Sequence, residues 1–170
     1  MTSSTRSKSF QWLALASLAA ALAGCGGGSE APGAMMSVNG DGMSTFNGEA
    51  LAANLATDPL QTLSAAEAAG LSFMRDEERL AQAVYTASAA RWPALPSFNN
   101  IAASEATHTA AIKSLLDRYQ VADPAAGLAL GSFAPPNFQT LYASLTAASN
   151  ASQIDALKVG AQIEELDIRD

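Results

Sequence analysis

The chain has 170 residues and a net charge of −7, and 49% of its residues are hydrophobic but only 6% are aromatic. Alanine supplies much of the apolar share, and no window alternates in the way of a strand, so we predict an all-α protein of one domain with appendages. The acidic balance and the lack of a basic patch interleaved with aromatic residues argue against nucleic-acid binding.

The N-terminus has the pattern of a secretory signal. Arg6 and Lys8 precede an apolar run over 12–23, which is too short to span a membrane. The segment that ends at Cys25 looks like a bacterial lipobox, in which this cysteine becomes the lipid-modified first residue; an ordinary signal with a chance cysteine is the alternative. We expect a signal peptide over 1–24 and a lipid anchor in the bacterial cell envelope. Glycine, not aspartate, follows the cysteine, which favours the outer membrane, facing the periplasm.

Residues 25–59 are rich in Gly, Ser, Ala and Met, and include the turn-like Asn39-Gly40-Asp41-Gly42. This composition predicts a flexible tether that would hold a helical domain over 60–170 away from the membrane.

The first long helix is expected from a capping box at Ser64 and Glu67 to about Arg91, where Trp92-Pro93 stops it. Its apolar stripe, at steps of three and four, consists of Leu71, Met74, Glu78, Ala81, Tyr85 and Ala89. A carboxylate in such a stripe needs a partner if the stripe faces a core. Glu77 lies on the neighbouring edge and is a reserve candidate; the alternative is a solvated charge run.

The second helix is expected after a proline-containing loop, capped by Ser97 or Asn99, and to end near Tyr119. Its stripe consists of Ile101, Glu105, His108, Ile112, Leu115 and Tyr119. Glu105 and His108, the only histidine, have the Glu-x-x-His spacing found in ferritin-like carboxylate metal proteins. Such matches also arise by chance, in which case the two side chains would pair with each other, or with Arg75 or Arg118.

A long crossover with a short helix over 138–145 precedes a third long helix, which begins at Ser152. The stripe of this helix reads Ile154, Leu157, Ala161, Glu164 and Ile168, again with one carboxylate among apolar residues. Glu165 and Asp167 flank the stripe and are further reserve ligands.

Four phrases, in order, resemble a prokaryotic ferritin-like family catalogued as domain of unknown function 2202. The phrases are Leu71–Ala81 (LSFMRDEERLA), Asn100–His108 (NIAASEATH), Leu115–Tyr119 (LLDRY) and Val159–Asp170 (VGAQIEELDIRD). The resemblance covers residues 60–170 and implies a ferritin-like bundle with a carboxylate-rich metal site and no established reaction. Family members continue into a further helix that ends in Asn-His-Leu, whereas this sequence ends at Asp170, so we expect a truncated bundle of three main helices plus a short crossover helix.

The expected function is metal binding through Glu78, Glu105, His108 and Glu164, with Glu77, Glu165 and Asp167 in reserve. Oxygen and nitrogen ligands of this kind suit iron, and also manganese or zinc, and the reaction, if any, would be metal-centred oxidation. One chain lacks a second histidine, so the remaining ligands could hold one ion by themselves or complete the site across a homodimer. The rival hypotheses are a lipid-tethered helical interaction module without metal and an inactive truncated fragment.

Overall fold

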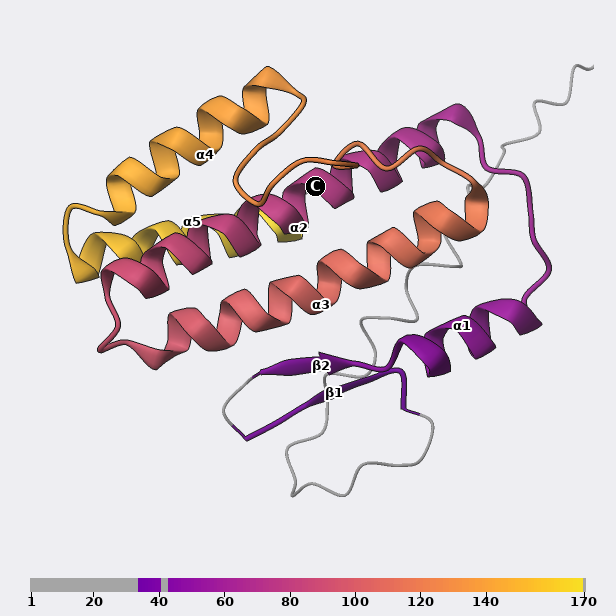
Figure 1. The fold of residues 1–170 in the computed structure, drawn as a ribbon, viewed down its shortest axis with the longest axis horizontal. Helices are drawn as coiled ribbons and strands as arrows, with labels where there is room; N and C mark the ends of the chain where they lie inside the picture. The colour runs from indigo at the N-terminus through magenta and orange to yellow at the C-terminus, as the bar shows by residue number, and fades with distance from the viewer. Residues whose placement is uncertain (1–33, 41–42, 170) are drawn as a thin grey trace, which may run out of the picture.

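The computed structural model of the chain describes residues 34–40 and 43–169, and helices dominate it (Figure 1). The elements are β1 (Met36–Val38), β2 (Ser44–Phe46), α1 (Gly48–Thr57), α2 (Ala65–Arg91), α3 (Pro96–Tyr119), α4 (Pro136–Ser149) and α5 (Gln153–Arg169). The predicted all-α helical bundle is therefore confirmed. Among the described residues, none of the helices combines the length and apolarity that crossing a membrane requires.

The long helices α2 and α3 form an antiparallel hairpin at the centre of the fold (Figure 1). The hydroxyl of Ser64 accepts a hydrogen bond from Glu67 N, and the carboxylate of Glu67 accepts one from Ser64 N, so the predicted capping box forms. The predicted caps of the second helix, Ser97 and Asn99, are wrong, because Pro96 already occupies the first turn and no side chain caps that end. Proline suits this place since it has no N–H to satisfy.

The segment predicted as a flexible tether over 25–59 contains two strands and a helix where the structure describes it. Strands β1 and β2 pair antiparallel, with Met36 opposite Phe46, and Ser44 N donates to the hydroxyl of Ser104 on α3 over 2.8 Å. Asn47 then caps α1 through its side chain. Asn39, one of the residues that suggested a linker, joins the two strands through hydrogen bonds with Met43, and Asn47 starts a helix. The predicted signal peptide and Cys25 lie outside the described residues.

The crossover after α3 returns along α2 before α4 begins (Figure 1). The guanidinium of Arg75 donates to both carboxylate oxygens of Asp123, over 3.1 and 3.2 Å, and to the carbonyl of Thr109. One turn further along α2, Arg79 donates to the carbonyl of Ala129 over 2.9 Å. Two buried arginines of α2 thus fix the path of the crossover.

Helices α4 and α5 pack together and against α2, and α4 is longer than the predicted short helix over 138–145. The start of α5 is as predicted, because the hydroxyl of Ser152 accepts a hydrogen bond from Asp155 N over 3.1 Å. The orientation of α5 is not as predicted. Its buried face consists of Ala156, Val159, Gly160 and Ile163, whereas Ile154, Leu157 and Ile168 of the predicted stripe are exposed. The small Gly160 lets the helix lie against the side chain of Tyr85, whose hydroxyl oxygen an added Cβ would meet at 3.1 Å.

A buried hydrogen bond joins α2 to α4. The hydroxyls of Ser88 and Ser149 are 2.6 Å apart, and both residues are almost fully buried. Replacing Ser88 with Ala leaves the Ser149 hydroxyl without its partner, so we expect a loss of about 1–2 kcal/mol in the free energy of unfolding. Urea unfolding measures it. The Ser88→Ala, Ser149→Ala double variant should lose less than the sum of the single variants, and full additivity would contradict this account.

Candidate metal centre

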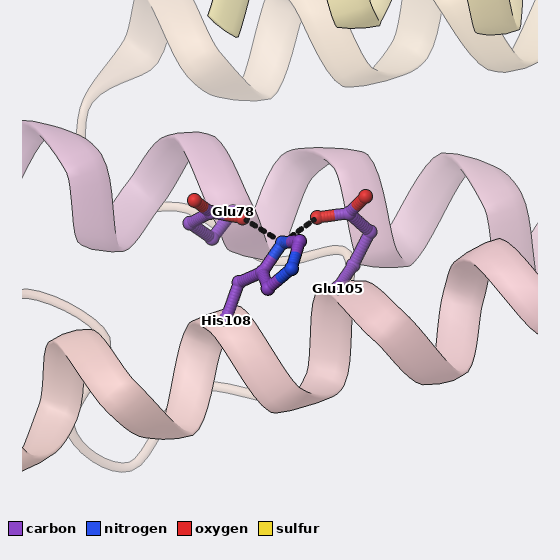
Figure 2. Close-up of side chains that lie close together, drawn as sticks. All are labelled: Glu78, Glu105 and His108. Carbon is purple, nitrogen blue, oxygen red and sulfur yellow. Dashed lines mark hydrogen bonds and ion pairs between the residues drawn. The ribbon is translucent and has the colours of Figure 1, made fainter. Parts of the chain in front are cut away.

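Helices α2 and α3 bring together three of the predicted ligands, Glu78, Glu105 and His108. Nδ1 of His108 lies 3.3 Å from Oε2 of Glu78 and 3.1 Å from Oε2 of Glu105. One ligand atom from each residue lies within 4.8 Å of the other two. Figure 2 shows the imidazole between the two carboxylates, with Glu78 reaching it from the opposite helix. The antiparallel pairing of α2 and α3 makes this possible, because it places the middle of one stripe against the middle of the other.

The three side chains differ in their access to solvent. The side chain of Glu105 is 5% exposed, that of Glu78 is 20% exposed and that of His108 is 35% exposed. The cluster is therefore closed on the side of Glu105 and open on the side of the histidine. An ion held here would keep one side accessible to water or a small ligand.

Burial and mutual charge determine the protonation of the cluster. Burial raises the pKa of the Glu105 carboxyl above its ordinary value, although the hydrogen bond with His108 opposes this. Hydrogen bonds with Glu105 and Glu78 raise the pKa of His108, because both carboxylates favour the imidazolium. A positive charge between two carboxylates is thus what this arrangement stabilises.

The two arginines that could have neutralised the cluster have other partners. Arg75 pairs with Asp123, and Arg118 donates to the carbonyl of Asp58 over 2.7 Å. The metal-free alternative paired Glu105 and His108 with each other or with an arginine. The structure contains the pair between Glu105 and His108, and Glu78 also contacts the histidine.

The fourth predicted ligand, Glu164, lies outside this cluster. Its Oε1 accepts a hydrogen bond from the hydroxyl of Tyr85 over 2.7 Å. Burial, followed by this hydrogen bond, raises the pKa of the Tyr85 phenol, and the charge of Glu105 adds to the effect. Tyr85 is therefore the partner of Glu164 on α2. Sequence analysis placed Tyr85 on the stripe of Glu78 but gave it no role, although its place two turns beyond Glu78 was a usable signal.

The reserve candidates are not in the cluster either. Glu77 and Asp167 line a cavity of about 110 Å³ between α2, α4 and α5, together with mostly apolar side chains such as Phe138 and Ile163. Glu165 is exposed on α5. Three of the predicted ligands thus form one compact group. The other four predicted residues, all carboxylates, lie elsewhere.

The chemistry of the three residues fits a divalent transition metal. Two carboxylates compete for one imidazole nitrogen, and a single proton on Nδ1 cannot serve both with ideal geometry. A cation at this place would satisfy both carboxylates and the nitrogen at once. Carboxylate oxygens with one imidazole are ligands for zinc, iron and manganese, and the described domain contains no cysteine that would favour a thiolate site.

The fold and this site define a helical bundle with a Glu-Glu-His cluster between its two central helices. The chain belongs to the family described as uncharacterized protein domain DUF2202, which it matches over residues 67–170. It is similar to the uncharacterized protein MJ0754 of Methanocaldococcus jannaschii, with 46% identity over 112 residues. That match covers 66% of this chain and 60% of the archaeal protein, so the chain spans less than two thirds of its relative. No solved structure matches the chain.

Proposed function

We propose that this protein binds a divalent transition metal, iron in the first place, through Glu78, Glu105 and His108. The observation that carries the proposal is that three potential ligand atoms from two helices lie within 4.8 Å of one another, around a buried carboxylate. The sequence resemblance to ferritin-like proteins supports iron, and manganese and zinc suit the same ligands.

Each residue has a distinct task in this proposal. Glu105 supplies the buried negative charge, Glu78 supplies a second oxygen from the facing helix, and His108 supplies a neutral nitrogen once its proton leaves. A bound iron would supply one-electron redox chemistry towards oxygen or peroxide. The partly exposed side of the cluster, next to His108, is where a small oxidant could enter.

The test is metal content and binding in the full chain. Elemental analysis of the purified protein, followed by titration of the chelator-treated protein with Fe(II), Mn(II) and Zn(II), should give about one ion per chain for this three-ligand site. The His108→Ala variant should lose the stoichiometric ion and keep its helical circular dichroism spectrum. Equal metal content in wild type and variant would show that the ion is bound elsewhere. A metal-free wild type that does not bind any of the three ions would overturn the proposal in favour of an interaction module.

We further propose that the domain is attached to the bacterial cell envelope through a lipid on Cys25, at the outer membrane. The support is the sequence alone, in which an apolar run over 12–23 leads to this cysteine. Mass spectrometry of the mature N-terminus should find a lipid-modified Cys25 in cells. In the Cys25→Ser variant the protein should leave the membrane fraction, and unchanged fractionation would contradict the anchor.

A further inference from the structure

Helix α5 has an apolar stripe that faces away from the core. Ile154 is 65% exposed, Leu157 is 50% exposed and Ile168 is 85% exposed, and the small Ala161 lies between them on the same side. Residues at steps of three and four share one helix face. Within the described part of the chain these large aliphatic side chains remain in water, and a row of this kind is typical of a face that packs against another helix.

This stripe is the second apolar face of α5, in addition to the face that is buried in the core. The opposite side of α5, with Val159 and Ile163, is already buried against α2 and α4. Among the residues that the structure describes, no element covers the outer stripe, as its exposure shows. We propose that a second copy of this chain covers it, with the two α5 helices antiparallel and a two-fold axis at Ala161.

The two isoleucines of the stripe are placed symmetrically about that residue. Ile154 lies seven residues before Ala161 and Ile168 lies seven residues after it. An antiparallel pair centred on Ala161 therefore places each Ile154 beside Ile168 of the second copy, and the small alanines at the axis let the two backbones approach. A two-fold interface uses the same patch on both copies, so one self-complementary stripe is sufficient.

Charge favours the same orientation. Lys158 and Glu165 flank the stripe on either side of Ala161, three and four residues away, and both are exposed. Antiparallel pairing places Lys158 of one copy beside Glu165 of the other, twice per dimer. Parallel pairing would place the flank that carries Lys158 and Glu165 on opposite sides of the interface in the two copies, so these charges would not meet. These contacts also offset locally the repulsion between two acidic chains.

Cysteine cross-linking of the full chain tests the axis. In a Cys25→Ser background, Ala161→Cys should give a disulfide-linked dimer under mild oxidation, because the two thiols would meet at the axis. Gln162→Cys is the matched control, since Gln162 is the next residue and is also exposed but points away from the stripe. No dimer with Ala161→Cys, or equal cross-linking of both variants, would overturn the proposal.

A charge swap tests the orientation. Lys158→Glu in the Ala161→Cys protein should weaken dimerisation roughly five-fold, because two attractive contacts become repulsive. The Lys158→Glu, Glu165→Lys double variant should restore it. Lys158 also donates to Asp155 on its own helix over 3.2 Å, so circular dichroism of each variant must first show that the fold is unchanged. The proposal does not depend on metal, and the failure of metal binding would leave it standing; a double variant that cross-links as poorly as the single variant would refute the antiparallel arrangement.

Discussion

Replacing Glu105 with Gln is expected to lower the affinity for Fe(II), Mn(II) or Zn(II) by at least about 100-fold, because the buried carboxylate is the main negative charge of the cluster. Glutamine has nearly the same shape and can still hydrogen-bond to His108, so the helices should keep their places. In metal-free protein the variant should not be less stable than wild type, since it removes a charge from a side chain that is 5% exposed. Isothermal titration and urea unfolding, both in chelator-treated buffer, measure the two effects.

The matched control is Glu77→Gln. Glu77 precedes Glu78 on α2 but lines the cavity between α2, α4 and α5, on another side of the helix. Its replacement removes the same charge from the protein without touching the cluster, so metal affinity should change less than about three-fold. A similar loss of affinity in both variants would mean that the ion responds to the overall negative potential of α2 and not to ligation by Glu105.

The elements with strong local signals could be predicted from the sequence. The capping box at Ser64 and the proline after Trp92 fix both ends of α2, and Ser152 fixes the start of α5. Glu105 and His108 are three residues apart on one helix, so their contact follows from helical geometry alone. Predicting that Glu78 joins them required one further assumption. The apolar stripes of α2 and α3, each of which contains a carboxylate, had to face each other.

The orientation of α5 could not be predicted in the same way. Helical periodicity defines faces around the axis of one helix but does not say which face meets a neighbour. The face that the sequence favoured carries Ile154 and Leu157, the more hydrophobic residues, whereas the buried face includes Ala156 and Gly160. The buried face of α5 is the one that carries Gly160, which lies close to Tyr85 on α2. This contact joins residues far apart in the chain, so the local sequence pattern does not reveal it. The displacement of Glu164 from the cluster follows from it.

Replacing Arg75 with Ala is expected to lower the free energy of unfolding at pH 7 by about 3 kcal/mol, because it removes the charged donor of Asp123, which keeps its hydrogen bond from Ala125 N, and the donor of the Thr109 carbonyl, in a mostly buried place. The crossover should also lose its attachment to α2 near Asp123. Urea unfolding measures the stability, and faster amide exchange around residues 121–125 should report the local effect. The Arg75→Ala, Asp123→Asn double variant should be more stable than Arg75→Ala alone, since it no longer buries an unpaired carboxylate.

The dependence of this loss on pH gives a sharper test. Burial alone would raise the pKa of Asp123, but hydrogen bonds from Arg75 and from Ala125 N hold it below its ordinary value. A carboxyl with a lowered pKa in the folded state stabilises the protein above its unfolded pKa of about 3.9, and this contribution disappears as the pH falls through the folded pKa. The difference between wild type and Arg75→Ala should therefore be largest near neutral pH and shrink below about pH 4. A difference that is constant between pH 7 and pH 3 would mean that Arg75 acts through packing of its aliphatic stem, and that the charge of Asp123 contributes little.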